Sequence, residues 1–338
     1  MKISIPFLVR AVALASGVLA MSMGASAQDT SPLVVYNAQH VSLTQAWADG
    51  FTKETGVKVI LRNGGDSELG NQLVQEGVAS PADVFLTENS PAMALVDAAG
   101  LFAPLEAATL AQVPANFRPT HGRWIGVAAR STVFVYNKSK LTPAQLPKSM
   151  LDLANPSWKG RWAASPSGAD FQAIVSALLE LKGEPATAAW LKAMKENFTP
   201  YKGNGTVMKA VNAGQIDGGV IYHYYHFGDQ AKTGENSNNT ALYYFRNEDP
   251  GAFVSISGGG VLASSKHAAK AQAFVKWATG KGGQEILKTG DSYEYAVGVG
   301  AQSNPKLVPL AELQAPKVEP SKLNSKKVSD LMTQAGLL

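Results

Sequence analysis

Short apolar runs alternate with amphipathic segments along this chain, and the alternation restricts the fold more than any other feature of the sequence. Residues 33–36 form an apolar run, and Leu43, Trp47 and Phe51 then recur at helical spacing before Gly56. A glycine at this place is typical of a helix C-cap. Strand–helix–strand units of this length predict an α/β fold in which a mostly parallel sheet has helices on both faces.

The same alternation continues in the first part of the chain. Residues 57–61 are the next predicted strand, Leu69 and Leu73 mark a helix that ends near Gly77, and 83–87 is a third strand. These elements complete a first set of strand–helix–strand units.

A second set of units begins further along the chain. We predict a strand at 160–164, helix-start residues at 165–167, an amphipathic helix up to Gly183, a helix at 207–213 and a strand at 219–222. Serine and proline are favoured at the start of a helix, and apolar residues at three- and four-residue spacing mark its buried face. The lysine-rich C-terminal tail is expected to end in a helix that docks on the rest of the chain.

The beginning of the chain has the pattern of a secretory signal peptide. Lys2 and Arg10 are positive, 11–23 is an apolar stretch of small and aliphatic residues, and 25–27 is the small-residue sequence Ala-Ser-Ala. The apolar stretch is shorter than the ~20 residues of a transmembrane helix. We therefore expect a signal peptide at 1–27, cleavage after Ala27, a periplasmic location and a mature chain that does not span a membrane.

The composition excludes several classes of protein. The hydrophobic fraction of 45% is typical of a folded globular chain. The formal net charge of +4 falls to +2 without Lys2 and Arg10, and this modest charge does not suggest a nucleic-acid partner. The chain has no cysteine, so disulfides and thiolate metal sites are impossible.

The length of the chain predicts two lobes, because a single hydrophobic core rarely supports more than about 300 residues. Two extended segments, 126–137 and 252–262, are the places where we expect the chain to cross between the lobes and back. The second lobe is then inserted into the first. The expected boundaries are 28–131 with 256–306 for the N-terminal lobe and 132–255 with 307–338 for the C-terminal lobe.

Recognisable catalytic motifs are missing from the sequence. It contains no GxSxG elbow, HExxH helix, P-loop or dinucleotide-binding glycine pattern. We interpret the glycine run at 258–260 as a bulge or hinge rather than a phosphate cradle. These observations favour a binding protein over an enzyme.

Polar residues follow four of the predicted strands, at the points where the strands end. His40 follows the first strand, Glu88 the third, and Ser167 and the pair Tyr224-Tyr225 follow the two strands of the second set. Ligands of open α/β sheets bind in the crevice outside the carboxyl ends of the strands. Residues from both lobes are therefore predicted to meet at a ligand in the cleft.

The residue types at these positions suit a hard, highly charged cation. Phenolate and carboxylate are hard anionic donors, and a bound trivalent cation can displace the tyrosine proton that is otherwise lost near pH 10. Two phenolates and one carboxylate would neutralise three positive charges, with the imidazole of His40 as a fourth ligand, and ferric ion fits this count. Neighbouring strand residues point to opposite faces, so Tyr224 and Tyr225 must lie on a turn or at a helix start.

Each of these residues also has a simpler interpretation. The tyrosine pair lies among Tyr222, His223 and His226 and is compatible with aromatic packing. His40 is compatible with a surface histidine, and Glu88 with a carboxylate that favours a helix N-terminus. Their joint occurrence at strand ends is what favours a metal site.

Five segments of the chain occur in an order that is typical of one known family. They are 36–40 (YNAQH), 83–88 (DVFLTE), 167–169 (SGA), 203–205 (GNG) and 224–225 (YY). Over nearly the whole mature chain this pattern resembles the periplasmic ferric-ion-binding proteins, the solute-binding components of iron ABC transporters. The resemblance implies a two-lobed periplasmic binding protein fold, related to transferrin lobes, with two extended crossover segments between the lobes.

The resemblance also implies a function and a set of metal ligands. His40 and Glu88 would be the iron ligands of the N-terminal lobe, and Tyr224 and Tyr225 those of the C-terminal lobe. The protein would capture ferric ion and deliver it to an inner-membrane permease and its ATPase. We expect it to act as a monomer.

Members of that family bind a synergistic anion, often phosphate, which completes the metal shell. By resemblance its contacts would map to Ser167, Gly168, Ala169 and Asn204. Free N–H groups at a helix start suit an anion at the first three of these residues. Arg130 resembles an arginine at the hinge side of the family's cleft, with a surface or lobe-bridging charge as the simpler interpretation.

Two positions depart from the family's pattern. Phosphate-dependent members carry Asn two positions before the first paired tyrosine, where this chain has Tyr222, and a phenol donates only one hydrogen bond. Some relatives place a tyrosine ligand where this chain has Asp170, which would then be a bystander. The anion is therefore left open among phosphate, carbonate and citrate, with Tyr222 and Asp170 as further cleft residues.

Two other functions stay open. An organic ligand such as thiamine, a polyamine or an iron chelate would use Tyr222, Tyr224 and Tyr225 as stacking or hydrogen-bonding walls. A secreted metal-dependent hydrolase is the alternative from another class, although no base or nucleophile pattern supports it.

Overall fold

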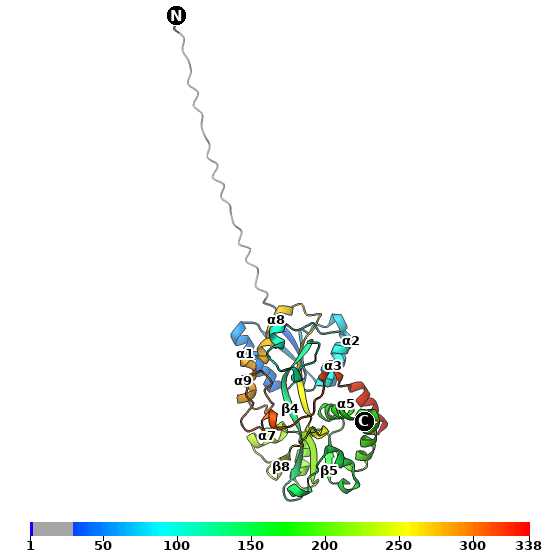
Figure 1. Ribbon diagram of the computed structural model, residues 1–338. Coiled ribbons are helices and arrows are strands. Elements are labelled where there is room, and N and C mark those ends of the chain that lie inside the picture. The colour runs from blue at the N-terminus through cyan, green and yellow to red at the C-terminus, as the bar shows by residue number, and fades with distance from the viewer. Residues whose placement is uncertain (3–29) are drawn as a thin grey trace. The chain divides into compact units, whose positions relative to one another are not determined.

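The computed structural model describes residues 1–2 and 30–338 of the chain (Figure 1). Pro32–Leu338 is one compact unit. The predicted signal peptide at 1–27 lies outside the described residues, apart from its first two positions. Within the described residues, no helix is both long and apolar enough to cross a membrane.

Two groups of parallel strands lie at opposite ends of a single sheet. In the first group β1 (Leu33–Asn37) pairs with β2 (Val59–Asn63) on one side and with β3 (Val84–Leu86) on the other. In the second group β5 is the central strand and pairs in parallel with both neighbours. The strands of this group are β5 (Trp162–Ala164), β6 (Phe198–Pro200) and β7 (Gly218–Tyr222). The parallel pairing predicted from the strand–helix alternation is confirmed for these groups.

The middle of the sheet is antiparallel, so the prediction of a mostly parallel sheet is wrong there. The long strand β4 (Trp124–Asn137) pairs first with β9 (Val254–Val261) and further along with β7 and with β8 (Thr240–Tyr243). Figure 1 shows β4 extending from the part of the molecule that holds α1, α2 and α9 into the part that holds β5 and β8. One long strand leads out of the first group and the other leads back, so the two run in opposite directions. They are the extended segments predicted at 126–137 and 252–262.

Helices cover the sheet, and most of them follow the predicted pattern. The α-helices of the described residues are α1 (Val41–Thr55), α2 (Asp66–Glu76), α3 (Ser90–Ala98), α4 (Ala107–Leu110), α5 (Ala169–Lys195), α6 (Asn204–Asn212), α7 (Tyr224–Lys232), α8 (Ala268–Thr279), α9 (Lys281–Thr289) and α10 (Ser325–Gln334). Short 3-10 helices lie at Gly77–Ala79, Ala115–Phe117, Pro143–Gln145, Met150–Ala154, Pro156–Trp158, Pro250–Ala252, Leu310–Glu312 and Pro320–Lys322.

Glycines set the ends of two predicted helices. Gly56 has a φ of 76° and donates its N–H to the carbonyl of Thr52, which is the predicted C-cap of α1. Gly183 interrupts α5 with a φ of 79°, and a second helical stretch that contains Pro185 follows the break. The predicted end of the amphipathic helix at Gly183 is therefore confirmed as a break within α5.

The start of α5 differs from the prediction. Its N-cap is Gly168, so the helix begins after the serines and proline of 165–167. The Ser165 hydroxyl accepts a hydrogen bond from the N–H of Gly203 at 2.9 Å, and its carbonyl accepts one from Gly168. Ser165 thus tethers the segment before α6 instead of capping α5.

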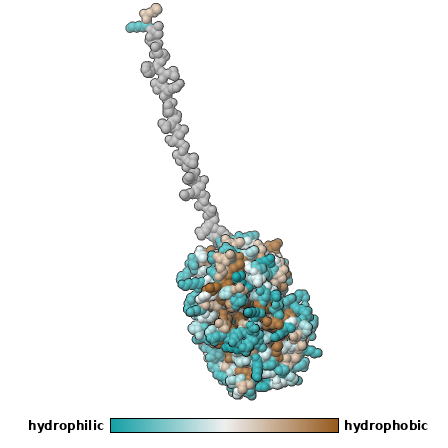
Figure 2. All heavy atoms as spheres, viewed as in Figure 1, coloured by the Kyte–Doolittle hydropathy of each residue, from teal (hydrophilic) through white to brown (hydrophobic). Residues whose placement is uncertain are grey.

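Buried aromatic side chains form the core on both sides of the long strands. Phe51 packs edge-on against Phe274 with 5.2 Å between ring centroids, and Trp162 lies 6.4 Å from Trp190. Helix α10 packs against α5, which confirms the predicted docking of the tail. The face of Pro32–Leu338 seen in Figure 2 is mostly hydrophilic, with apolar residues interspersed in small groups.

The buried glycine run at 258–260 lies in β9 opposite an irregularity in β4. The pairing register between the two strands shifts between Gly126 and Ala128. A methyl group on any of the three glycines would come within 3.0 Å of a neighbouring side chain, and at Gly258 the neighbour is Met93. The interpretation of the glycine run as a bulge is therefore wrong, because the run is regular strand and the irregularity lies opposite it on β4.

Gly126 is expected to be intolerant of substitution. A methyl group at this position would lie 2.5 Å from the carbonyl oxygen of Phe117 and 2.8 Å from Cγ2 of Ile256. Gly126→Ala should lower the free energy of unfolding by about 1–3 kcal/mol, the usual cost of overpacking a core, as measured by urea denaturation. Gly205→Ala in α6 is the control, because no heavy atom would lie within 4 Å of its methyl group. Equal urea midpoints for the two variants would contradict this assignment.

Candidate metal centre

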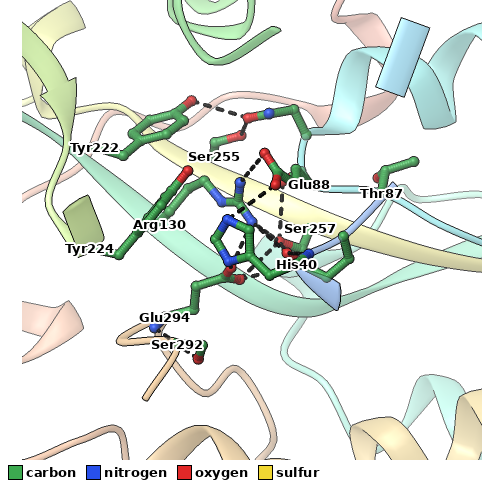
Figure 3. Close-up of polar contacts among 12 residues, drawn as sticks. His40, Thr87, Glu88, Arg130, Tyr222, Tyr224, Ser255, Ser257, Ser292 and Glu294 are labelled. Carbon is green, nitrogen blue, oxygen red and sulfur yellow. Dashed lines mark hydrogen bonds and ion pairs between the residues drawn. The ribbon is translucent and has the colours of Figure 1, made fainter. Parts of the chain in front are cut away.

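The structure brings together four residues that the sequence predicted as metal ligands. His40 is the N-cap of α1, directly after β1, and Glu88 follows β3. Tyr224 and Tyr225 are the first two residues of α7, directly after β7, so the predicted helix start is confirmed. The imidazole Nε2 of His40 lies 3.1 Å from Oε1 of Glu88, and its ring lies 4.7 Å from that of Tyr224 (Figure 3).

The two tyrosine hydroxyls converge on one carboxylate. Tyr224 and Tyr225 stack with 4.4 Å between ring centroids, and both donate to Oδ2 of Asp170 at 3.2 Å. The same oxygen accepts a hydrogen bond of 2.7 Å from Nδ2 of Asn204. Asp170 is buried in the first turn of α5, and it is the meeting point of the tyrosine pair rather than a bystander.

Arg130 lies behind these residues on β4 and is fully buried. Its guanidinium donates to Oε2 of Glu88 at 3.2 Å and to Oε1 of Glu294 at 2.9 Å. The guanidinium carbon lies 5.3 Å from the centre of the Tyr224 ring, close enough for a cation–π contact. The interpretation of Arg130 as a surface charge is therefore wrong, because all of its side chain is shielded from solvent.

Sequence reasoning missed Glu294, which is fully buried beside His40. One of its oxygens, Oε1, lies 2.9 Å from Nδ1 of His40 and accepts from Arg130 (Figure 3). The other, Oε2, accepts from Nε2 of Gln39 at 3.0 Å. No strand end or motif marks Glu294 in the sequence, so only tertiary structure reveals it.

Asn89 is a second missed residue, and it joins several elements. Its amide nitrogen donates to Asp66 at 3.1 Å and to Oδ1 of Asp170 at 2.9 Å. Its amide oxygen accepts from Tyr222 at 3.3 Å and from Ser255 at 2.8 Å. Tyr222 thus serves a buried polar network, in the position where the family pattern suggested an anion contact.

The predicted anion residues are not all at one place. Ser167 and Ala169 line a cavity of about 580 Å³ together with Asp66 and Asn89, and Gly168 is the N-cap of α5. His40 and the tyrosine pair line a separate hollow of about 300 Å³. Asn204 contacts Asp170 on the tyrosine side. Of the four predicted residues, Asn204 is therefore the one that hydrogen-bonds to the Asp170 carboxylate, which also holds both phenols.

Burial and neighbouring carboxylates control protonation in the hollow. Burial raises the pKa of both Tyr224 and Tyr225, and the Asp170 carboxylate raises these pKa values further. Burial also raises the pKa of Asp170, and the negative charge of Glu88 adds to this effect. Without a cation, the phenols therefore keep their protons and donate hydrogen bonds to Asp170.

The histidine side of the site is governed by ion pairs. Burial would lower the pKa of His40, but its hydrogen bonds to Glu294 and Glu88 raise it to about 10. Burial would raise the pKa of Glu294, but Arg130 and His40 lower it to about 2. The site thus combines phenol and carboxylate oxygens, which are hard and can carry negative charge, with an imidazole nitrogen that is neutral once its proton leaves. Within the described residues no trio of His, Asp and Glu side chains is arranged to hold a metal ion.

A helix-flanked mixed sheet with a polar hollow at the strand ends is the architecture of an extracytoplasmic solute-binding protein. The chain belongs to the bacterial extracellular solute-binding protein family, whose model matches residues 79–322. It is 75% identical to the Fe(3+)-binding periplasmic protein of Serratia marcescens, over 97% of each chain. It is 38% identical to the major ferric iron-binding protein of Neisseria meningitidis serogroup B, over 94% of this chain and 97% of that one.

Solved structures support the same assignment. The crystal structure of iron-bound HitA from Pseudomonas aeruginosa has a TM-score of 0.85 and 41% identity, over 90% of this chain and 99% of HitA. A Trichodesmium protein in complex with iron and citrate has a TM-score of 0.77 and 27% identity, over 91% of this chain and 100% of that one. The predicted α/β periplasmic binding protein fold is confirmed by these matches.

Arg130 is expected to contribute more to stability than an exposed arginine. Arg130→Met would remove the guanidinium partner of the buried Glu294 carboxylate, at a cost of about 3–5 kcal/mol in the free energy of unfolding. Arg161→Met is the matched control, because Arg161 pairs with Asp217 at 2.7 Å but is 38% exposed. Its loss should cost less than about 1 kcal/mol. Urea denaturation at neutral pH measures both, and equal losses would contradict the buried role of Arg130.

Proposed function

We propose that this protein captures ferric iron in the periplasm and delivers it to an inner-membrane ABC transporter. One observation carries the proposal: two tyrosine hydroxyls converge at the start of α7, opposite the imidazole of His40 and the carboxylate of Glu88. These are the hard donors that a trivalent cation requires. The names of the relatives, a Fe(3+)-binding periplasmic protein and a ferric iron-binding protein, support the same ligand.

The tyrosine pair is the docking point for the ion in this proposal. Ferric ion displaces the phenol protons of Tyr224 and Tyr225, because its charge outweighs the effects that otherwise hold those protons. His40 and Glu88 then complete the protein ligands from the other side. Nε2 of His40 and Oε1 of Glu88, which lie 3.1 Å apart, have to separate to admit the ion.

Closure of two lobes around the ion follows from the proposed boundaries. The N-terminal lobe would comprise 28–131 and 256–306, and the C-terminal lobe 132–255 and 307–338. Strands β4 and β9 run between them, and a ligand stabilises the closed form only through its stronger binding to that form. Because the ligands come from both lobes, the ion binds more strongly to the closed form than to the open one. The protein would act as an exported monomer, without catalytic turnover, that meets the permease and its ATPase when loaded.

A carboxylate of the chain itself lies where an anion of the metal shell would be expected. Asp170 already places a carboxylate against both phenols and Asn204, with hydrogen bonds of 2.7–3.2 Å. We propose that this carboxylate supplies negative charge beside the ion, where the family pattern suggested phosphate, carbonate or citrate. Ser167, Gly168 and Ala169 then serve as a secondary anion site.

Optical titration with ferric ion tests the proposed ligand. Binding through tyrosinate should give a visible charge-transfer band, and Tyr224→Phe and Tyr225→Phe should each weaken the band and lower the affinity at least tenfold. Tyr243→Phe on β8 is the control, because Tyr243 lies outside the hollow and should leave band and affinity unchanged. A colourless wild-type protein would refute iron binding and favour an organic ligand such as thiamine or a polyamine.

Dependence on added anions tests the role of Asp170. Wild-type protein should bind ferric ion in a buffer without phosphate, carbonate or citrate, because Asp170 supplies the negative charge from within the chain. Asp170→Ala should require one of these anions to regain affinity, as measured by titration in their presence and absence. If wild type also needs an added anion, or if the variant binds equally well without one, Asp170 does not have this role.

A further inference from the structure

Glu294 is an acidic side chain beside the candidate metal centre whose two oxygens are both paired. It is fully buried, and both of its carboxylate oxygens accept hydrogen bonds or ion pairs. Oε1 contacts Arg130 and Nδ1 of His40, each at 2.9 Å. Oε2 contacts Nε2 of Gln39 at 3.0 Å and the hydroxyl of Ser257 at 3.3 Å. A buried carboxylate with four such partners has one position and one orientation available to it.

The backbone around Glu294 is held equally firmly. Tyr293 has a φ of 53°, a left-handed conformation that is uncommon for a bulky aromatic residue. Tyr295 exchanges backbone hydrogen bonds with Ala129, the residue before Arg130 on β4. The turn at Tyr293 and the bridge at Tyr295 together place the side chain of Glu294 next to the guanidinium of Arg130. Strained backbone of this kind persists where the surroundings over-determine it, and it is often found at functional sites.

The two flanking tyrosines connect Glu294 to the helix that bears the tyrosine pair. Tyr295 stacks on His223, the N-cap of α7, with 4.7 Å between ring centroids. Tyr293 stacks on Phe227 in the first turns of α7 at 5.8 Å. The segment 293–295 therefore contacts α7 through Tyr293 and Tyr295 and contacts His40 through Glu294. The relative position of these two parts of the site depends on this segment.

The contact between His40 and Glu294 decides which ring nitrogen an ion can reach. Both ring nitrogens lie against carboxylates that only accept, Nδ1 against Glu294 at 2.9 Å and Nε2 against Glu88 at 3.1 Å, so each carries a proton in this arrangement. Glu294 is fully buried whereas Glu88 is partly exposed, so Nε2 is the nitrogen that an ion can reach once the contact with Glu88 opens. The ring is thereby fixed in the orientation shown in Figure 3, with Nε2 directed away from Glu294. Metal-binding histidines depend on such a partner, which fixes the tautomer and the ring direction.

We propose that Glu294 is a positioning residue for metal capture, which holds Nδ1 of His40 so that Nε2 is presented to the ion. This inference rests on the proposed binding of ferric ion by His40, Glu88 and the tyrosine pair. Glu294 does not contact the metal itself, since both of its oxygens are used by protein donors. Its effect on the metal passes through the imidazole.

The main competing explanation is that Glu294 only neutralises Arg130. Both roles involve the same oxygen, Oε1, so a loss of iron affinity on substitution would fit either of them. The two explanations differ in one respect. A positioning role disappears when the imidazole is absent, whereas a role through Arg130 does not.

A double-mutant cycle separates these explanations. Glu294→Gln keeps the shape of the side chain and removes its charge, and ferric affinity is measured by competition with nitrilotriacetate. We expect a 10- to 100-fold loss of affinity, the usual effect of removing the partner of a metal-binding histidine. In the His40→Ala background the same substitution should change the affinity less than about twofold. Glu285→Gln on α9, an exposed carboxylate, is the matched control and should have no effect.

Each outcome has a defined meaning. Unchanged affinity of Glu294→Gln, or an equal loss with and without His40, would overturn the positioning role. If wild type shows no ferric binding, the proposed function fails instead, and the cycle is not reached. If Glu294→Gln does not fold, Glu294→Asp is the substitute, because it keeps the negative charge but shortens the side chain that reaches the imidazole. It should then show a loss of affinity that depends on His40 in the same way.

A spectroscopic measurement gives an independent readout. In the complex with diamagnetic gallium(III), the ¹⁵N spectrum of wild type should show His40 with a slowly exchanging proton on Nδ1. Glu294→Ala, which leaves no acceptor at this position, should lose this protection while the resonances of Trp162, in the distant β5, stay unchanged. A protected Nδ1 proton in the variant would show that another group holds the ring and would overturn the inference.

Discussion

The burial of the Arg130 charge is the constraint on which the rest of the site depends. A guanidinium cannot lose its proton inside a protein, so a fully buried one requires carboxylates around it. Glu88 and Glu294 meet this requirement from two segments far apart in the sequence. Because Arg130 lies on β4 where that strand pairs with β9, the carboxylates that neutralise it have to lie near the centre of the sheet. The candidate metal centre is built around this point.

The remaining side chains take positions that follow from this charge. Glu294, held by Arg130, in turn holds His40, and Glu88 receives the other imidazole nitrogen. On the opposite side, the phenols of Tyr224 and Tyr225 keep their protons and donate to Asp170. The phenol, carboxylate and imidazole groups therefore lie together in this structure, joined by hydrogen bonds and ion pairs.

Local patterns explain how much of this could be predicted. The strand and helix positions depend on apolar periodicity and glycine caps, which are properties of neighbouring residues, and the structure confirms them at α1, α6, β7 and β9. The tyrosine pair was expected at a helix start because two adjacent strand residues cannot face one point. The antiparallel centre of the sheet was not expected. Strand direction depends on which distant segments pair, and periodicity carries no information about pairing.

What the sequence determined by itself was the order of the elements and the kind of donors at the strand ends. His40, Glu88, Tyr224 and Tyr225 could be singled out because each directly follows a predicted strand. Tertiary structure alone decided that Asp170 meets both phenols and that Glu294 meets His40. Asp170 and Tyr224 are 54 positions apart in the sequence, and His40 and Glu294 are 294 − 40 = 254 positions apart. A buried polar group needs a hydrogen-bond or ion-pair partner, and these groups become buried only once the chain has folded.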